Sequence, residues 1–413
     1  MKEFDIAVIG AGPAGCMAAI RAAELGKNVV IIERNEGIGK KILLSGKGRC
    51  NITNSGPLDA FVEKFGKEGD FFRSAFFSFF NQDLIGFFES RDLTMKRERQ
   101  NRIFPATDSA LSVVKVLKDV LSKNKVTILH KSRLSSIKKK SNHFELQIND
   151  TDKISAKKVI LATGGKSYKE TGSTGDGFNI AHKLGHTIVR LKPCLVPLKT
   201  KEAWVKELQG LGLKNVRITF RTGKKKIASP IGEIMFTHFG ISGPLVLDLS
   251  GDIVSALKKD EKANLFIDLK PALQTEELEN RLLNEFMDKG STQINNLFKV
   301  LLPIRLIPVF IRLLKMDPER KASQITQKDR AAIIRLLKAF PLTIMGSLPI
   351  EEAMVTGGGI SLKEINPRTM ESKIILGLYF AGEIIDGAAS SGGFNMQRAF
   401  STGYLAGEKA SNA

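Results

Sequence analysis

The chain has 413 residues, of which 42% are hydrophobic and 26% charged, so it is long enough for two or three domains with substantial cores. It opens on an apolar segment without a leader-like pattern, and no apolar run is long enough to span a bilayer, which predicts a cytoplasmic protein that does not enter the membrane. Cys16, Cys50 and Cys194 form no Cys-x-x-Cys pair, which excludes a dithiol centre and predicts no metal site. Redox chemistry would therefore need a bound organic cofactor.

The charge is strongly positive, with 63 Lys and Arg against 43 Asp and Glu and a formal net charge of +20. Ten basic and two acidic residues lie between Lys192 and Lys226. The ten are Lys192, Lys199, Lys201, Lys206, Lys214, Arg217, Arg221, Lys224, Lys225 and Lys226. This excess favours a polyanionic partner such as RNA. A solvated lysine-rich surface explains the same residues, and both interpretations stay open.

The predicted elements begin with a βαβ unit, in which residues 4–10 and 28–33 form strands and residues 13–25 form a helix of small side chains. Residues 56–104, rich in Phe and Arg, are predicted to form helices that cover the site. Further strands are predicted at 126–129, 144–148 and 159–162. This first block is typical of an α/β nucleotide-binding domain.

The later part of the chain predicts an inserted segment, followed by elements that complete the first domain. Residues 191–271 alternate in polarity and are predicted to form an inserted β-rich domain, while 272–345 are predicted to form a helical subdomain. Its helices are expected at 275–289, 291–315 and 326–340, with Pro303 and Pro308 breaking the second. A strand at 376–382 and a final helix then complete a discontinuous domain made of residues 1–190 and 346–413.

The first turn carries the motif G-x-G-x-x-G, read as Gly10-Ala11-Gly12-Pro13-Ala14-Gly15, between the first strand and helix. Gly10 permits the tight turn, Gly12 allows close approach to a pyrophosphate, and Gly15 allows close packing of helix and strand. The helix N-terminus offers unpaired N–H groups to the phosphates. Glu33, at the end of the second strand, is placed to accept hydrogen bonds from ribose hydroxyls. These features predict a dinucleotide site.

The other end of the chain decides between NAD and FAD. An apolar strand ends in Gly382-Glu383 and leads through Ser391-Gly392-Gly393 into a helix that starts with Phe394, Asn395 and Met396. In flavoproteins of the glutathione-reductase type, such an acid binds the ribitol chain, and the helix dipole stabilises negative charge on the reduced flavin. Two binding elements at opposite ends predict FAD.

Several long motifs resemble those of the BaiN-like (YhiN-type, aminoacetone-oxidase-like) flavoproteins. They are residues 39–54 (GKKILLSGKGRCNITN), 162–165 (ATGG), 236–244 (FTHFGISGP) and 356–359 (TGGG), together with the C-terminal block. Lys47 departs from the pattern, because many relatives carry Gly or Asn there. The resemblance covers the whole chain and implies an α/β fold: a glutathione-reductase-type, Rossmann-like FAD-binding domain, an inserted β-barrel-like domain and a helical subdomain.

Motifs and resemblance together assign the cofactor-binding residues. They are Gly10, Gly12, Pro13, Ala14, Gly15, Glu33, Arg34, Lys41, Ser45, Gly46, Arg49, Cys50, Asn51, Thr163, Gly164, Gly165, Gly382, Glu383, Gly392, Gly393, Phe394, Asn395 and Met396. Arg49 is expected near the flavin, and residues 357–359 are expected to approach it with their backbone.

Two side chains are candidates for catalysis. The Cys50 thiol could give a proton to a carbon acid, although the sequence favours a buried cysteine that packs against the cofactor. His238, in a glycine-rich loop, could contact substrate or be structural. Both alternatives stay open for each residue.

The function that these features favour is reduction of an activated C=C bond, with NAD(P)H as a transient electron donor. The resemblance implies either a uridine in large-subunit ribosomal RNA or a small unsaturated substrate. An amine oxidase that produces hydrogen peroxide is the competing enzyme, although a basic chain is poorly suited to cationic amines. A non-catalytic FAD-containing binding protein is the third interpretation. No oligomeric state is predicted.

Overall fold

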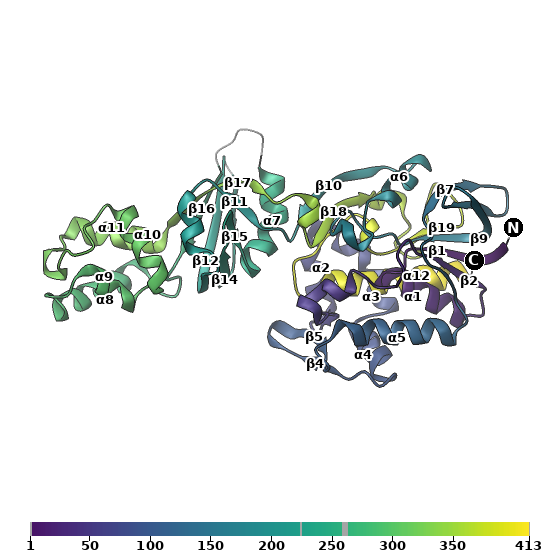
Figure 1. Cartoon of the computed structure of the whole chain (residues 1–413), viewed down its shortest axis with the longest axis horizontal. Coiled ribbons are helices and arrows are strands. Elements are labelled where there is room, and N and C mark those ends of the chain that lie inside the picture. Colours follow the sequence, from purple (N-terminus) through teal and green to yellow (C-terminus); the bar gives the residue numbers. More distant parts are fainter. Residues whose placement is uncertain (1, 224, 258–262, 413) are drawn as a thin grey trace. The chain divides into compact units, whose positions relative to one another are not determined.

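The computed structural model describes residues 2–223, 225–257 and 263–412. The chain divides into two compact units, the first made of Met1–Cys194 with Ile350–Ala413 and the second of Leu195–Pro349. The first unit thus contains both ends of the chain (Figure 1). None of the described helices is long and apolar enough to cross a membrane.

A seven-stranded sheet forms the centre of the first unit, with the order β6-β2-β1-β9-β8-β7 and with β19 also paired to β9. Its strands are β1 (Lys2–Ile9), β2 (Val29–Ile32), β6 (Thr127–Leu129), β7 (Leu134–Lys139), β8 (Phe144–Ile148), β9 (Asp152–Leu161) and β19 (Leu378–Phe380). The pairs β6–β2, β2–β1, β1–β9 and β9–β19 are parallel, whereas β7 and β8 add an antiparallel hairpin. Parallel strands need both faces covered, and their near-continuous Val and Ile content meets that condition. The α/β fold and its FAD-type strand arrangement are confirmed.

Small residues bring the first and last helices together. Helix α1 (Pro13–Glu24) packs along α12 (Phe394–Asn412). A Cβ at Gly403 would lie 2.2 Å from the Ala14 carbonyl oxygen, and one at Gly407 would lie 2.3 Å from that of Ala18. The two helix backbones therefore approach more closely than side chains would permit, so the C-terminal helix α12 packs directly on α1 (Figure 1).

The remaining elements of the first unit surround this core. They are α2 (Leu58–Lys64), α3 (Arg73–Ser78), α4 (Asn81–Glu89), α5 (Ala110–Lys123), α6 (Asp176–Lys183), the sheet of β3 (Thr53–Asn54), β4 (Met95–Arg97) and β5 (Arg102–Pro105), and the pair β10 (Ile188–Cys194) with β18 (Val355–Ile360). The helices predicted in residues 56–104 are confirmed, while strands β3, β4 and β5 were not predicted.

The second unit is built on a barrel. Its strands run in the order β13-β12-β14-β15-β11-β17-β16, and an additional pairing of β12 with β16 closes the ring. They are β11 (Leu198–Thr200), β12 (Gly212–Thr222), β13 (Lys225–Ala228), β14 (Gly232–Phe236), β15 (Gly240–Ser242), β16 (Ala263–Asp268) and β17 (Phe340–Ser347). The predicted β-barrel-like insertion is confirmed. Helix α7 (Pro244–Ala256) packs against it and was not predicted, although Gly243-Pro244 is a helix-start signal.

The helices of the second unit share one hydrophobic core with the barrel. They are α8 (Thr275–Asp288), α9 (Ile294–Leu297), α10 (Ile307–Leu314) and α11 (Gln327–Lys338). The predicted helix at 291–315 is interrupted between α9 and α10, where Pro303 lies, whereas Pro308 sits in the first turn of α10 and does not break it. The helix predicted to reach residue 340 ends at Lys338, because Phe340, Leu342 and Ile344 alternate inward as a barrel strand. The separation of a β-rich from a helical domain stays a prediction.

Candidate functional site

The three motif glycines differ in what surrounds them. Gly10 has φ +99°, and a Cβ there would lie 2.6 Å from the Ala162 carbonyl oxygen. A Cβ on Gly15 would lie 1.8 Å from the Gly10 oxygen, so this glycine closes helix onto strand. Gly12, at the N-terminus of α1, has nothing within 4 Å of its Cβ position. Two glycines are therefore required by protein packing, whereas the third faces open space where a phosphate could approach.

The Glu33 carboxylate shapes this loop. It is 6% exposed; its Oε2 accepts a hydrogen bond from the Ala11 N–H at 2.7 Å, and its Oε1 accepts two from Asn35, at 2.8 Å from the backbone and 2.7 Å from the side chain. A carboxylate offers about four lone-pair sites. One site is left for a ribose hydroxyl, which keeps the predicted role open. The neighbouring Arg34 instead binds Thr174 Oγ1 at 2.6 Å and Asp176 at 3.2 Å, at the start of α6.

The loop from Ser45 to Asn51 has an unusual backbone. Gly46, Lys47, Gly48 and Cys50 all have positive φ, of 58°, 59°, 85° and 65°. The Ser45 hydroxyl donates to the Ile42 carbonyl oxygen at 2.6 Å. Lys47 thus adopts a conformation that favours the Gly or Asn expected from the resemblance.

Arg49, which the sequence predicts to lie near the flavin, makes several contacts within the protein. Its guanidinium is paired with Glu98 at 2.8 Å and Asp108 at 3.3 Å, and it stacks 4.2 Å from the Phe104 ring centre. These contacts hold the loop against β4 and β5. A flavin contact by Arg49 stays a prediction, and it would have to share the guanidinium with two carboxylates.

The same loop fixes the start of α12. In the side-chain orientation that gives both the amide oxygen and the amide nitrogen of Asn51 a hydrogen-bond partner, the oxygen accepts from the Gly393 N–H at 2.9 Å. A Cβ on Gly393 would lie 2.3 Å from the Thr53 oxygen, and Asn54 donates to the Gly392 oxygen at 3.1 Å. Gly392 and Gly393 have φ values of 126° and 95°. The glycine turn before α12 is therefore built to fit the N-terminal loop.

The first residues of α12 close this turn in different ways. Asn395 Oδ1 accepts from the Ala389 N–H at 3.0 Å, and its Nδ2 donates to the Ala389 oxygen at 2.8 Å, so its amide closes the loop that precedes the helix. The Phe394 ring packs edge-on against Phe61, with centres 4.8 Å apart. Met396 is partly buried against the core of the first unit.

The end of β9 meets the Gly-Glu strand end. A Cβ on Gly165 would lie 2.3 Å from Thr356 Oγ1 and 2.8 Å from Glu383 Oε1. Gly164 has φ +75°, and the buried Thr163 hydroxyl has no hydrogen-bond partner among the described residues. Gly382, with φ +78°, lies so close to α1 that its Cβ would be 2.8 Å from that of Ala14. Both predicted binding elements thus meet in the first unit.

The Glu383 carboxylate is held by three groups of the protein. Its Oε2 lies 2.7 Å from Lys41 Nζ, while its Oε1 accepts from the Thr356 N–H at 2.8 Å and from the Ser167 hydroxyl at 3.1 Å. Burial raises the pKa of the Glu383 carboxyl, but Lys41 and the Thr356 hydrogen bond outweigh burial and hold this pKa below its ordinary value. The site therefore keeps a carboxylate near the end of β19.

Arg398 was not predicted, yet it is the largest fully buried side chain, at 1% exposure. It donates to the Gly387 carbonyl oxygen and lies 5.6 and 5.4 Å from the ring centres of Phe65 and Phe72. Burial lowers its pKa to about 10, opposed by Glu383 and Asp386, so it stays a cation at neutral pH. Its Nε has no partner in the described part of the chain. The sequence signal that could have identified Arg398 is an arginine on the buried face of the last helix.

The two candidate catalytic residues lie in different units. Cys50 is fully buried, and burial raises the pKa of its thiol to about 11 although a Ser45 hydrogen bond opposes this. His238 belongs to the second unit, between β14 and β15, where it is exposed and packs edge-on against Phe239 with ring centres 4.9 Å apart.

Residues 357–359, within β18, need glycine for protein packing, because a Cβ on Gly358 would lie 2.3 Å from the Arg190 oxygen.

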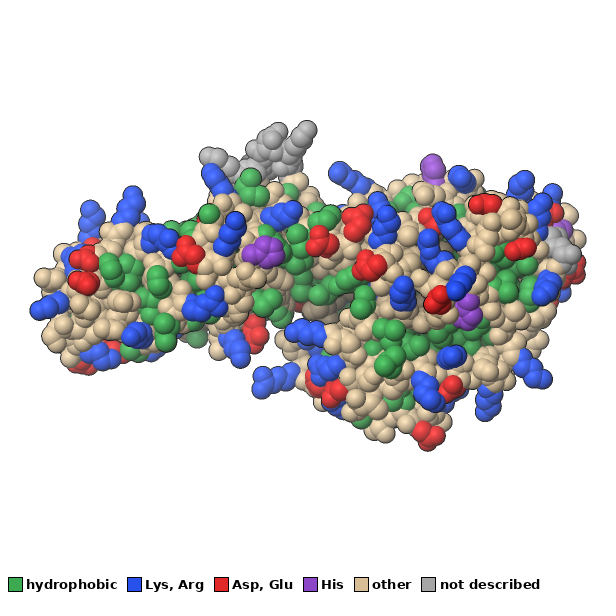
Figure 2. Space-filling view, viewed as in Figure 1, with side chains coloured by type: hydrophobic (Ala, Val, Ile, Leu, Met, Phe, Trp, Pro, Cys, Tyr) green, Lys and Arg blue, Asp and Glu red, His purple; other side chains and the backbone are tan. Residues whose placement is uncertain are grey.

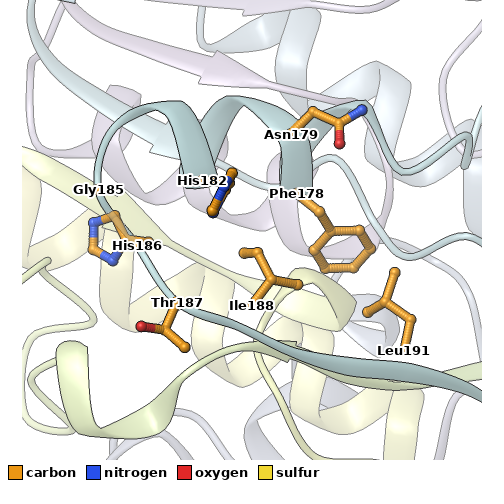
Figure 3. Close-up of a pocket in the computed structure, with 8 residues that line it drawn as sticks. All are labelled: Phe178, Asn179, His182, Gly185, His186, Thr187, Ile188 and Leu191. Carbon is orange, nitrogen blue, oxygen red and sulfur yellow. The ribbon is translucent and has the colours of Figure 1, made fainter.

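A hollow of about 530 Å³ lies beside α6 and β10 (Figure 3). The Phe178, Ile188 and Leu191 side chains line it together with His182 and His186. His186 is buried, and burial lowers its pKa despite Glu364 at 3.3 Å, while its Nε2 lies 3.0 Å from the Ser372 hydroxyl. This histidine therefore ties β10 to the segment before β19. None of the predicted site residues lines the hollow.

The arrangement of the first unit fits FAD. Gly12 leaves open space at a helix N-terminus, Glu33 keeps one free acceptor position, and Thr163 and Ser390 keep buried hydroxyls without partners among the described residues. These groups come from the first turn, the end of β2, the end of β9 and the turn before α12. They belong to one unit and match the donors and acceptors of a dinucleotide.

Comparison with known proteins supports this assignment. The HI0933-like protein Rossmann domain family matches residues 4–409. A Clostridium scindens protein named 3-dehydro-bile acid delta(4,6)-reductase is 34% identical over 408 residues, which cover 98% of each chain. The ribosomal RNA dihydrouridine synthase of Escherichia coli is 31% identical over 415 residues, 98% of this chain and 97% of that protein.

Solved structures show the same fold. A flavocytochrome c3 fumarate reductase in its open conformation matches with a TM-score of 0.54 and 17% identity, covering 100% of this chain and 78% of that one. The 3-ketosteroid delta1-dehydrogenase of Sterolibacterium denitrificans matches with a TM-score of 0.53 and 12% identity over all of both chains. From the match along its whole length, the chain belongs to the HI0933-like family of FAD-binding oxidoreductases.

Proposed function

We propose that this protein is an FAD-dependent reductase that takes electrons from NAD(P)H and reduces a C=C bond conjugated with a carbonyl group, with a uridine in large-subunit ribosomal RNA as the favoured substrate. The observation that carries the proposal is the full-length similarity to two kinds of reductase. The delta(4,6) double bonds conjugated with a 3-oxo group and the pyrimidine C=C bond of uridine are both electron-poor. Reduction of an electron-poor C=C bond therefore accounts for both names.

The residues of the first unit would divide the work of holding the cofactor. FAD would supply the hydride chemistry. The open backbone at Gly12 would receive the pyrophosphate, and Glu33 the adenosine ribose. Glu383 would face the ribitol chain while Lys41 holds its carboxylate in place. The N-terminus of α12, after the Gly392-Gly393 turn, would stabilise negative charge on the flavin pyrimidine.

The net charge of +20 favours RNA over a small anionic substrate, because neutralisation of phosphates by Lys and Arg drives RNA binding. The sequence identities of 34% and 31% do not separate the two substrate classes. A small 3-oxo substrate with conjugated double bonds is the second candidate, favoured by the Clostridium scindens relative.

Cys50 and His238 stay proposals for the second proton and for a substrate contact. Burial raises the pKa of the Cys50 thiol to about 11, which favours a role as proton donor over one as thiolate nucleophile at neutral pH. Cys50→Ala should then lower the rate of substrate reduction without slowing flavin reduction by NADPH. Equal loss in both half-reactions would assign Cys50 to packing.

The proposal is tested by two measurements. Ribosomal RNA from cells with and without the protein is mapped by mass for dihydrouridine, and loss of one modified position is the expected result. Purified holoprotein is mixed with NADPH under anaerobic conditions, and bleaching of the flavin is expected. Bleaching by an amine such as aminoacetone, with peroxide release once oxygen is admitted and with no response to NADPH, would replace the reductase by an oxidase. FAD that no donor reduces would make the protein a non-catalytic binder.

A further inference from the structure

We propose that one wall of the barrel in the second unit is a docking surface for a single-stranded segment of the RNA, with Phe266 as the stacking platform for a base. The wall consists of the outward side chains of β13, β12, β16 and β17, namely Lys226, Ala228, Arg217, Thr219, Arg221, Asn264, Phe266, Asp268, Pro341 and Thr343. The proposal rests on the proposed function, because it names the contact surface for the favoured substrate.

Strand register places these side chains in rows. Arg221 pairs with Lys226 on one side and Asn264 on the other, which makes a polar, basic row. The next row joins Ala228, Thr219, Phe266 and Pro341. Since alternate residues of a strand point to the same face, the apolar row follows directly beside the basic one.

Phe266 points away from the core. Its strand neighbours Leu265 and Ile267 are both fully buried at 0% exposure, whereas Phe266 is partly exposed on the outer face. The Arg221 guanidinium lies 5.7 Å from the centre of its ring. An outward aromatic ring flanked by a guanidinium is how sheet-based domains stack an unpaired base.

The charges around the ring suit a polyanion. Arg217, Arg221 and Lys226 are exposed. Within the described part of the chain, the carboxylate of Asp268 pairs with Lys338 at 2.7 Å, and Arg217 and Arg221 have no carboxylate within ion-pair distance. The wall is therefore net positive, and its acid, Asp268, lies opposite Arg217 and is paired with Lys338. Lys224, which belongs to the same basic run of the sequence, lies outside the described residues.

In the structure, the basic residues between Lys192 and Lys226 are divided between the two units. Lys192 belongs to β10 in the first unit, and only the part on β12 and β13 flanks Phe266. Lys and Arg side chains appear over the visible faces of both units rather than in a single patch (Figure 2). What marks this wall is the aromatic ring between cations, because charge alone does not distinguish it.

The test measures RNA affinity of the full-length holoprotein. The probes are a labelled single-stranded oligouridine and an unmodified large-subunit ribosomal RNA transcript, each titrated over a range of salt concentrations. Phe266→Leu keeps an apolar side chain and removes the ring, and about tenfold weaker binding is expected. The double variant Arg217→Gln with Arg221→Gln should reduce the salt slope by about 1.4, since a single-strand phosphate contact contributes about 0.7.

The matched control removes two exposed cations elsewhere, Lys118→Gln with Lys123→Gln on α5, and its salt slope should stay close to that of the unaltered protein. Melting temperature and FAD content check that each variant is folded. Unchanged binding by both wall variants would overturn the docking surface. Displacement of RNA by polyglutamate as effective as by unlabelled RNA would overturn the stacking role of Phe266 and indicate a general polyanion surface.

The outcomes separate the two proposals. If both wall variants bind RNA normally and uridine is still reduced, the reductase stands and the wall is wrong. If the unaltered protein binds neither of the two RNA probes at low salt, both the proposal of an RNA substrate and the proposal of a docking surface are wrong. Normal flavin reduction by NADPH in Phe266→Leu, with slower reduction of the RNA, is the result that the docking surface predicts.

Discussion

Lys41 Nζ lies 2.7 Å from Glu383 Oε2, although 342 residues separate the two in the sequence. This ion pair joins the loop after the first βαβ unit to the end of β19, where Gly382-Glu383 is one of the two elements that predict FAD. The side chains are 25% and 16% exposed, so the pair is mostly shielded from solvent.

Glu383→Gln is expected to destabilise the protein by about 2 kcal/mol, because it leaves the Lys41 ammonium unpaired in a partly buried site. FAD affinity should fall as well. The measurement is urea unfolding with and without FAD. Lys41→Met with Glu383→Gln serves as the control, since removal of both charges should recover part of the loss.

Glu383 also predicts a pH dependence. Because its pKa in the folded protein lies below its ordinary value of 4.5, the carboxylate stabilises the fold fully above that pH and loses its contribution as the pH falls toward the folded pKa. The free energy of unfolding should therefore decrease below about pH 4.5. Glu383→Gln should show a flatter curve in this window. Parallel curves would mean that other carboxyls cause the decrease.

Lys47→Gly should stabilise the protein by about 0.5 kcal/mol or more. Lys47 has φ +59°, which costs a side-chain-bearing residue about 1–2 kcal/mol, and glycine avoids this cost while losing more chain entropy. Lys40→Gly is the matched control, an exposed lysine of the same loop region without positive φ, and should destabilise. Thermal melting distinguishes the two. Equal destabilisation by both would contradict the strain assigned to Lys47.

Gly403→Ala should separate α12 from α1, since its Cβ would lie 2.2 Å from the Ala14 oxygen. Overpacking of this kind costs about 1–3 kcal/mol or more, and FAD binding should weaken because the start of α12 moves. Gly86→Ala in α4 is the control: nothing lies within 4 Å of its Cβ, so it should stabilise by about 0.5–1 kcal/mol. Destabilisation by both would show a general intolerance of alanine.

Arg398→Met should destabilise by about 3 kcal/mol, because it removes the buried cation that faces Glu383 and Asp386. Burial already raises the Asp386 pKa, and Arg398 opposes this effect, so the carboxyl should titrate at higher pH in the variant. Arg398→Met with Asp386→Asn should be more stable than Arg398→Met alone. Additive losses in a double-mutant cycle would show that the two groups are not coupled.

The sequence predicted the parts of the site that depend on local pattern. The G-x-G-x-x-G turn, Glu33 and the Gly382-Glu383 strand end follow from short motifs whose backbone needs are local. Arg398 and Thr356 were missed, because their contacts depend on how α12 and β18 pack in three dimensions. The ion pairs of Arg49 with Glu98 and Asp108 were missed for the same reason, since no spacing rule connects them. Helix α7 was hidden by an otherwise β-rich pattern.

FAD titration of Gly12→Ala tests the central claim most directly. The Cβ position of Gly12 is open, so the apoprotein should unfold at the same urea concentration as the unaltered chain, while the added methyl group would occupy the space that we propose for the pyrophosphate. Steric overlap of about 1–3 kcal/mol predicts roughly ten- to hundredfold weaker FAD binding. One FAD per chain, bound by Gly12→Ala as tightly as by the unaltered protein, would contradict the account.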